Sequence, residues 1–209
     1  MNRLAAALVL AGLSPLLALI GFAVRVSMGR PVLFTQARSG RGGTTFDILK
    51  FRTMTQCRYA GEPDAERITR VGALLRNSSL DELPSFWNVL RGDMAFVGPR
   101  PFIAQYANLY NEREARRLDV KPGITGWQQV NGRNRLTWDE KFELDVWYVE
   151  NRTRWLDFKI LCKTPPALMR SSGRAHGSHV TMPVFDRQRT AADDEQRADD
   201  APDWCEPRR

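Results

Sequence analysis

The chain is poor in the residues that build disulfide frameworks and zinc sites. Its three cysteines, Cys57, Cys162 and Cys205, are odd in number, far apart and without a CxxC pair. This pattern predicts neither a disulfide framework nor a zinc site. The two histidines, His176 and His179, form an HxxH with no second ligand cluster, whereas a zinc site needs three or four ligands. We therefore interpret them as satisfied or solvated polar residues.

Acidic residues are too few to balance the basic ones. The 209 residues are 43% hydrophobic and 26% charged, with a net charge of +7. This composition excludes a disordered chain and a polytopic membrane protein, and the charge indicates a polyanionic partner: nucleic acid, anionic lipid or a phosphorylated substrate. Residues 186–209 hold eight acidic residues and five arginines, a net of −3, so residues 1–185 carry +10.

Long hydrophobic runs are absent except for one, at residues 4–24, which contains no charge. A straight helix of that length would reach about 30 Å, enough to cross a bilayer. Three interpretations compete: a signal peptide cleaved near Gly21-Phe22-Ala23, a spanning helix, and a re-entrant hairpin. Basic residues are concentrated directly after the run, where anionic headgroups would lie.

The middle of the apolar run favours the re-entrant hairpin. Ser14-Pro15 lies at its midpoint, and proline removes one N–H and clashes with the carbonyl four residues earlier. The Ser14 hydroxyl can bond back to freed backbone groups, so a break there is tolerated in lipid. Arg3 lies at one end of the run and Arg25 at the other. We therefore expect residues 1–29 to form a membrane hairpin with both ends on the cytoplasmic face.

Residues 32–36 and 45–52 read as two strands. The segment 39–43 between them is rich in turn formers, so a β-hairpin is predicted. In the second strand Lys50 shares a face with apolar residues. A lysine on such a face either extends its ammonium group to water or has an anionic partner.

Helical spacing predicts five helices. They cover residues 68–76, 83–89, 103–118, 138–150 and 155–163, the last ended by Pro165-Pro166. From residue 186 the chain has little to bury, which predicts a disordered tail at 186–209. The sequence thus predicts a mostly helical α+β fold, with one domain at 30–185 between the membrane hairpin and the tail.

The most informative stretch, residues 76–84, reads Arg-Asn-Ser-Ser-Leu-Asp-Glu-Leu-Pro. With Asp81 as helix N-cap, Pro84 would occupy the third helical position without a clash. One interpretation is structural: Asp81 caps the helix, and the negative charge of Glu82 interacts favourably with the positive end of the helix dipole. The other is chemical. The helix N-terminus receives a phosphate, Asp81 attacks phosphorus to give an acyl phosphate, and Glu82 holds Mg²⁺, with Asp93 as the second-choice ligand.

Cations must surround such a site, because a carboxylate and a phosphate repel each other. The candidates are Lys50, Arg76 and Arg100. Prolines on both sides of Arg100 fix its backbone and favour a guanidinium held on an anion, although a solvated arginine in a rigid loop is the alternative. The loop 121–127 is either the wall of a base or sugar pocket or an ordinary turn packed by Trp127.

Several motifs occur in order along the chain. They are Ser14-Pro15 in the apolar run, Lys50-Phe51-Arg52-Thr53-Met54, Ser79-Leu80-Asp81-Glu82-Leu83-Pro84, Asn88-Val89-Leu90-Arg91-Gly92-Asp93-Met94, Gly98-Pro99-Arg100-Pro101, and Lys121 to Asn134. From about residue 3 to 165 the chain resembles the bacterial sugar transferase family, the monotopic phosphoglycosyl transferases, in their short single-domain form. The resemblance implies a mostly helical fold with a small β-hairpin, resting on one leaflet.

The resemblance also implies a function. Members transfer a sugar 1-phosphate from a UDP-sugar to undecaprenyl phosphate, release UMP, use Mg²⁺, and start O-antigen, capsule, exopolysaccharide or glycoprotein glycan synthesis. Carried over, Asp81 is the nucleophile and Glu82 the metal ligand, while Lys50, Arg76 and Arg100 bind phosphate. Residues 30–185 become the catalytic domain, on the cytoplasmic face of the bacterial inner membrane, and no nucleic acid is a partner.

Two features depart from the family pattern. The N-terminus reads Asn2-Arg3-Leu4-Ala5-Ala6 in place of the usual Lys-Arg…Phe-Asp start, and the tail after Arg187 has no counterpart. Two rival functions are a non-catalytic basic protein on a membrane or nucleic acid, and an enzyme that transfers a sugar without its phosphate and so releases UDP. The sugar, the glycan pathway and the oligomeric state are not encoded in any motif we identify.

Overall fold

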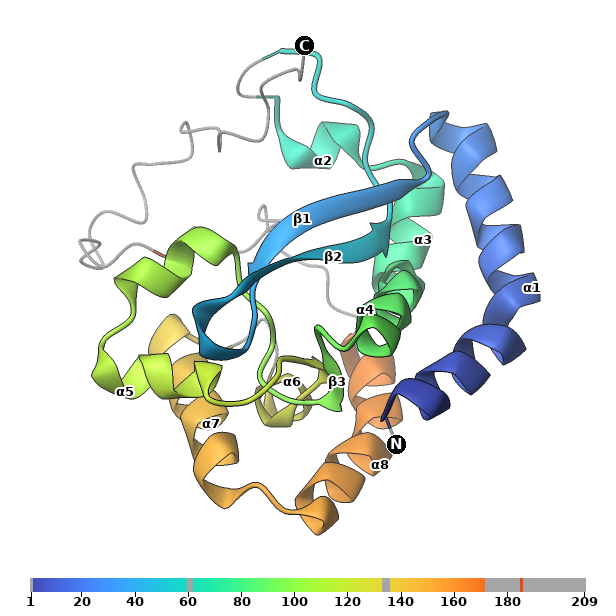
Figure 1. Cartoon of the computed structure of the whole chain (residues 1–209). Helices are drawn as coiled ribbons and strands as arrows, with labels where there is room; N and C mark the ends of the chain where they lie inside the picture. The colour runs from blue at the N-terminus through green and yellow to red at the C-terminus, as the bar shows by residue number, and fades with distance from the viewer. Residues whose placement is uncertain (1, 60–61, 133–135, 172–184, 186–209) are drawn as a thin grey trace.

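The computed structural model describes residues 2–59, 62–132, 136–171 and 185 (Figure 1). The α-helices are α1 (Asn2–Met28), α2 (Asp64–Arg67), α3 (Arg70–Ser78), α4 (Phe86–Arg91), α5 (Glu112–Ala115), α6 (Trp127–Asn131), α7 (Trp138–Asn151) and α8 (Arg154–Ser171). The strands are β1 (Leu33–Ser39), β2 (Thr45–Phe51), β3 (Ala95–Val97) and β4 (Gly123–Thr125), and the 3₁₀ helices are η1 (Arg41–Gly43), η2 (Leu80–Ser85), η3 (Ala104–Leu109) and η4 (Arg116–Leu118). The predicted mostly helical α+β class is confirmed.

The predicted hairpin is confirmed as an antiparallel β1–β2 pair, with register from Leu33 opposite Phe51 to Ser39 opposite Thr45. The strands are joined by η1, in which Gly42 and Gly43 adopt positive φ angles of 64° and 76°. Glycine favours this turn because it adopts positive φ at no steric cost. The hairpin places Lys50 near the end of β2, beside the start of η2.

A second, parallel sheet of β3 and β4 was not predicted from the sequence. Ala95 pairs with Gly123 and Val97 with Thr125. A Cβ on Gly123 would lie 2.1 Å from the backbone nitrogen of Gly98, so this close approach requires glycine. The loop that carries Arg100 follows β3 directly and is fixed to β4, because the Gly123 N–H donates to the Pro99 carbonyl at 2.9 Å.

The N-terminal segment is one continuous helix, α1, and the expected break into two helices at Ser14-Pro15 is not confirmed. Pro15 has no N–H to donate to the Ala11 carbonyl, and the Ser14 hydroxyl donates to that carbonyl instead, at 2.8 Å. The helix therefore continues through the proline, and in Figure 1 its ribbon curves along one side of the molecule. By length and composition α1 is long and apolar enough to cross a membrane.

Both halves of α1 pack against the same folded body. In the first half, Ala6 is buried in a cluster with Ile48 and Val89. In the second half, Ile20 and Val24 are buried in a cluster with residues of β2 and α3. Beyond the helix end, the Arg52 guanidinium donates to the backbone carbonyls of residues 28–30. Most of the remaining α1 surface is exposed, so this helix presents a long apolar face.

Four predicted helices have different bounds. The helix predicted at 68–76 is α3, which begins at Arg70 and ends at Ser78. In place of a helix at 83–89, the 3₁₀ helix η2 leads into α4. In place of one helix at 103–118, there are η3, α5 and η4, because Asn111 starts a new helix as N-cap in a capping box with Glu114. The predicted helix at 155–163 extends to Ser171 through Pro165 and Pro166.

The continuation of α8 has a local explanation. Pro165 and Pro166 leave the carbonyls of Leu161 and Cys162 without helical donors, and all four residues are exposed, so water can replace those donors. The predicted helix at 138–150 is confirmed as α7, with Thr137 and Glu140 forming its capping box. The proposed tail at 186–209 and the HxxH pair lie outside the described residues.

Aromatic side chains support the segment that follows the Arg100 loop. Phe102, Tyr106 and Phe142 form a buried cluster, packed against Trp138 and closed by Phe185. The Phe185 N–H donates to the Tyr106 hydroxyl at 3.2 Å. Residues far apart in the sequence thus pack together next to the loop that carries Arg100.

Candidate active site

The Asp81-Glu82 pair lies in the first turn of η2, and this turn begins in an unusual way. Its N-cap is Ser79, which adopts a left-handed conformation at φ 56° and lets α3 lead directly into η2. The interpretation of Asp81 as the N-cap is therefore wrong, because the N-cap is Ser79 and the turn starts two residues earlier than Asp81 would require. Among the described residues, the Asp81 carboxylate accepts no hydrogen bond.

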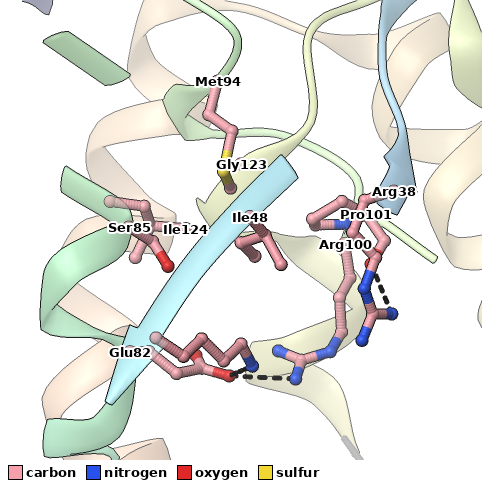
Figure 2. Close-up of a pocket in the computed structure, with 10 residues that line it drawn as sticks. Arg38, Ile48, Glu82, Ser85, Met94, Arg100, Pro101, Gly123 and Ile124 are labelled. Carbon is pink, nitrogen blue, oxygen red and sulfur yellow. Dashed lines mark hydrogen bonds and ion pairs between the residues drawn. The ribbon is translucent and has the colours of Figure 1, made fainter. Parts of the chain in front are cut away.

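Glu82 has two cationic partners from separate segments. Its Oε1 accepts a hydrogen bond from Lys50 Nζ of β2 at 2.7 Å and another from Arg100 Nη2 of the loop after β3 at 3.0 Å. Figure 2 shows the Arg100 guanidinium turned toward the Glu82 carboxylate. Of the two alternatives for Lys50, an ammonium group extended to water or an anionic partner, the structure shows the anionic partner. Since both contacts fall on Oε1, Oε2 has no donor within the part of the chain that the structure describes.

The two adjacent carboxylates have opposite pKa shifts. Burial alone would raise the pKa of Glu82, but Lys50 and Arg100 hold it well below its usual range. For Asp81, burial and then the neighbouring Glu82 raise the pKa to about 6, against the smaller influence of the surrounding cations. Glu82 therefore stays ionised, while Asp81 is a weakly solvated carboxylate that titrates just below neutral pH.

Arg76 lies near the pair without touching it. Its Nε donates to Thr53 Oγ1 at 2.9 Å and its Nη2 to Met54 Sδ at 2.9 Å, both neutral partners. Burial lowers the pKa of Arg76, and the negative charge of Asp81 partly opposes this shift. Among the described residues no carboxylate pairs with Arg76. Its charge is therefore not neutralised by direct contact with an acid of the described chain, and Arg76 is not among the residues that line the pocket described below.

Lys50 is positioned by two residues that the sequence analysis did not single out for this role. The buried Asn88 side chain makes two hydrogen bonds to the backbone of β2, as a neighbouring strand would. Its Oδ1 accepts from the Leu49 N–H at 3.0 Å and its Nδ2 donates to the Asp47 carbonyl at 2.7 Å. Ser85 Oγ donates to the Leu49 carbonyl at 2.8 Å. Strand β2 is thus held to η2 and α4 immediately before Lys50.

Arg100 is positioned by a buried ion pair, also missed. Arg117 and Asp145 are both almost completely inaccessible to solvent and lie 2.8 Å apart. The Arg117 guanidinium also donates to the Arg100 carbonyl and lies 4.1 Å from the centre of the Phe102 ring. The pair is separated by 28 residues in sequence, so no local motif reveals it.

These segments line a partly open pocket, whose empty space of about 320 Å³ includes solvent at its mouth. Its charged lining consists of Arg38, Lys50, Glu82 and Arg100, and its apolar wall includes Ile48, Met94 and Ile124. Figure 2 shows Arg38 and Arg100 entering from the same side. A pocket wall was one of the two interpretations of the loop 121–127, and Gly123 and Ile124 of that loop line this pocket. Arg38 was not predicted.

Comparison with known proteins decides the family. The profile described as "Bacterial sugar transferase" matches residues 1–171. The chain belongs to the bacterial sugar transferase family. It is therefore an enzyme, and its long apolar N-terminal helix indicates association with a membrane. The resemblance stated from the sequence motifs is confirmed.

Three similar members of the sugar transferase family illustrate the match. The chain is 51% identical over 165 residues to the uncharacterized sugar transferase EpsL of Bacillus subtilis, covering 78% of this chain and 82% of EpsL. It is 41% identical over 184 residues to the UDP-glucose:undecaprenyl-phosphate glucose-1-phosphate transferase of Caulobacter vibrioides, covering 81% and 68%. It is 37% identical over 190 residues to the exopolysaccharide production protein ExoY of Rhizobium meliloti, covering 81% and 84%.

The described part of this sugar transferase offers few side-chain ligands for the expected Mg²⁺. Among residues 2–59, 62–132, 136–171 and 185, no group of three or more His, Cys, Asp or Glu side chains gathers around one point. Mg²⁺ at phosphate sites usually takes only one or two carboxylates besides water and substrate oxygens. The open Oε2 of Glu82 fits that mode of binding. Asp93, the second choice, contacts Arg91 and Asn88 and does not line the pocket.

Proposed function

We propose that this sugar transferase moves a sugar 1-phosphate from a UDP-sugar to undecaprenyl phosphate, releases UMP, and so begins the synthesis of a bacterial polysaccharide. The single observation that carries the proposal is Asp81, a carboxylate without a hydrogen-bond partner among the described residues, next to a Glu82 held by Lys50 and Arg100. The name of the Caulobacter relative describes the same transfer with glucose, and the name of ExoY points to exopolysaccharide production.

The proposed reaction has two steps. An oxygen of Asp81 bonds to the phosphorus that carries the sugar, and the bond from that phosphorus to the bridging oxygen breaks, so UMP leaves and an aspartyl phosphosugar forms. An oxygen of the lipid phosphate then attacks the same phosphorus and releases Asp81. Asp81 is suited to attack because it is ionised above about pH 6 and has no hydrogen bond to give up.

The surrounding cations reduce the repulsion between nucleophile and substrate. Lys50 and Arg100 are held on Glu82 at the pocket, and Arg76 carries a charge that no carboxylate of the described chain neutralises. In the proposal these three residues bind the phosphates and stabilise charge that develops at phosphorus. Mg²⁺, when bound by Glu82, would supply further neutralisation of the diphosphate.

We infer that α1 enters and leaves the membrane on one face, with the catalytic domain at residues 30–185 on the cytoplasmic side of the inner membrane. Two observations support a re-entrant segment at 1–29. Both halves of α1 pack on the same body, and both ends are attached to it: Arg3 lies against Gly92, and Arg52 donates to carbonyls at the other end. A helix that crossed the bilayer would carry one end away from that body.

The experiment that tests the proposed function identifies the nucleotide released. The purified enzyme is incubated with undecaprenyl phosphate, Mg²⁺ and a panel of UDP-sugars, and the products are separated by ion-exchange chromatography. We expect UMP with at least one sugar. Release of UDP would support transfer of the sugar without its phosphate, and release of neither nucleotide across the panel would contradict the proposed reaction.

The same assay tests the metal. EDTA should abolish UMP release and Mg²⁺ should restore it, because phosphate-rich substrates need a hard cation beside the acidic nucleophile. Glu82→Gln should lower turnover by about 100-fold or more, since it removes the proposed ligand and weakens the hold on Lys50 and Arg100. The matched control is Glu143→Gln, because Glu143 is an exposed carboxylate of α7 that pairs with Arg113 of α5. Full activity of Glu82→Gln would place the metal elsewhere.

A further inference from the structure

Arg38 is a cation of the pocket to which the proposed reaction assigns no role. It lies near the end of β1, opposite Phe46 in the hairpin, and lines the pocket together with Lys50 and Arg100. Figure 2 shows its side chain running beside that of Arg100 into the same space. The hairpin thus contributes two cations to the pocket, one from each strand.

The hydrogen bonds of Arg38 leave its charge unmatched. Its Nη1 donates to the Pro101 carbonyl at 3.3 Å and its Nη2 to the side-chain oxygen of Gln36, and both acceptors are neutral. Its Nε is buried and has no partner in the described part of the chain. Burying a charge is costly unless an opposite charge is near. In agreement with this, burial and the neighbouring Arg100 lower the pKa of Arg38 to about 10.

The charges of the pocket lining do not balance. Arg38, Lys50 and Arg100 are cationic, and Glu82 is the one carboxylate among the lining residues. Glu82 is already shared by Lys50 and Arg100, and Arg38 contacts no acid among the residues that the structure describes. A partly enclosed pocket with such an excess of positive charge attracts anions. A phosphate group offers several acceptor oxygens, which suits the planar donor fork of an arginine.

We propose that Arg38 is a further phosphate-binding residue, which contacts a phosphate group of a substrate in the pocket beside Arg100. This inference rests on the proposed function, which supplies two sources of that chemistry: the diphosphate of the nucleotide sugar and the phosphate of the lipid. The competing explanation is structural, because the contact with Pro101 also ties β1 to the Arg100 loop.

The experiment compares Arg38→Gln and Arg38→Lys with the wild-type full chain. Arg41→Gln is the matched control, because Arg41 belongs to the same hairpin, is exposed and donates to the Asp119 carbonyl. UDP binding is measured by titration calorimetry, and KM is measured separately for the UDP-sugar and for undecaprenyl phosphate. The melting temperature of each variant reports its stability. Because the calorimetry needs no turnover, it remains informative even if the wild type releases no UMP and the proposed function fails.

The expected result is about a tenfold weaker affinity for UDP and a similar rise in KM for the UDP-sugar in Arg38→Gln, a smaller change in Arg38→Lys, and none in Arg41→Gln. A rise confined to the KM for undecaprenyl phosphate would assign Arg38 to the lipid phosphate instead. If both Arg38 variants bind UDP normally and keep both KM values, the proposal is overturned, whatever their melting temperature. Should Arg38→Gln not fold, Arg38→Lys decides between the same outcomes, because lysine keeps the charge but not the fork.

Discussion

At the scale of single residues, the environment shifts the pKa values of two neighbouring carboxylates in opposite directions. Glu82 is held by Lys50 and Arg100, whereas Asp81 is surrounded by charges that do not touch it. Because the folded-state pKa of Asp81 lies above the ordinary value of 3.8, its ionisation lowers stability as the pH rises from about 4 to about 6. Glu82 has the opposite sign: its depressed pKa stabilises the fold above its ordinary value of 4.5, and this contribution is lost in acid.

The raised pKa of Asp81 predicts the pH dependence of the first chemical step. If ionised Asp81 is the nucleophile, the rate of UMP release should increase about tenfold per pH unit below about 6 and level off above it. The measurement is a rapid-quench time course with UDP-sugar and Mg²⁺ but no lipid, because the phosphate monoester of the lipid itself titrates near pH 6. A rate that stays flat from pH 5 to 8 would contradict the assignment of Asp81.

Sequence motifs identified most of the charged residues of the site but not their contacts. Lys50, Glu82 and Arg100 lie in short motifs and were expected in one site, but the hydrogen bonds from Lys50 and Arg100 to a single oxygen of Glu82 were not. The buried pair of Arg117 and Asp145, by contrast, depends on how α7 packs against η4, which no local pattern encodes. Arg38 was missed because its approach to Arg100 depends on the course of β1 past the loop, a tertiary feature.

At the scale of secondary-structure elements, the site depends on how closely α3, β2 and α4 approach one another. A Cβ on Gly72 of α3 would lie 1.8 Å from the Thr53 carbonyl oxygen, so glycine is required for α3 to reach the chain after β2. That approach brings Arg76 to its partner Thr53. On the other side, Asn88 of α4 holds the edge of β2.

Asn88→Ala tests this second contact. The change removes two hydrogen bonds to β2 and leaves backbone groups of Asp47 and Leu49 unpaired, so the free energy of unfolding should fall by about 1–3 kcal/mol. UMP release should also slow, because Lys50 follows the loosened segment. Chemical denaturation measures the first effect, and Asn108→Ala, at an exposed position of η3, is the control. Unchanged stability and turnover would exclude a role for Asn88 in holding β2.

Element boundaries were predicted well where local signals agree and poorly where they compete. The hairpin and α7 have turn or capping signals at the predicted places. The segment 103–118 follows helical spacing, but Asn111 favours a helix start over a helix interior, and the chain breaks there. Asp81 failed as a cap for a related reason, because the left-handed Ser79 starts the turn earlier.

At the scale of the whole molecule, α1 arches along one side of the catalytic body, and both of its end regions pack on that body (Figure 1). This arrangement leaves its exposed apolar face as the surface that a membrane would cover. Among its exposed side chains are Leu4, Leu8, Leu19, Phe22 and Val26. The two attached ends and the arginines beside them favour a helix that enters one leaflet and returns.

Cysteine labelling tests this topology. In a cysteine-free background, single cysteines at Asn2 and at the exposed Thr44 are treated with a membrane-impermeant reagent in intact cells. We expect both to react only after the inner membrane is permeabilised, because both ends of α1 should face the cytoplasm. Pro15→Ala should move part of the population to a spanning form. Labelling of the Asn2 site from the periplasm in the unmodified helix would show that α1 crosses the membrane.

The most direct test of the central claim is made before any lipid is added. With UDP-sugar and Mg²⁺ alone, the enzyme should release ~1 UMP per active site and gain one sugar phosphate. Mass spectrometry of a quenched digest should locate that adduct on the peptide that contains Asp81. The Asp81→Asn protein should fold at least as stably at pH 8, because it lacks the buried charge, so a loss of activity cannot be attributed to unfolding.

The account predicts that Asp81→Asn shows neither the burst of UMP nor the adduct, because a neutral amide is a poor nucleophile. Two results would contradict the account: an Asp81→Asn enzyme that turns over at nearly the wild-type rate, or a wild-type enzyme that releases UMP only when undecaprenyl phosphate is present. Either result would mean that the lipid phosphate attacks the UDP-sugar directly.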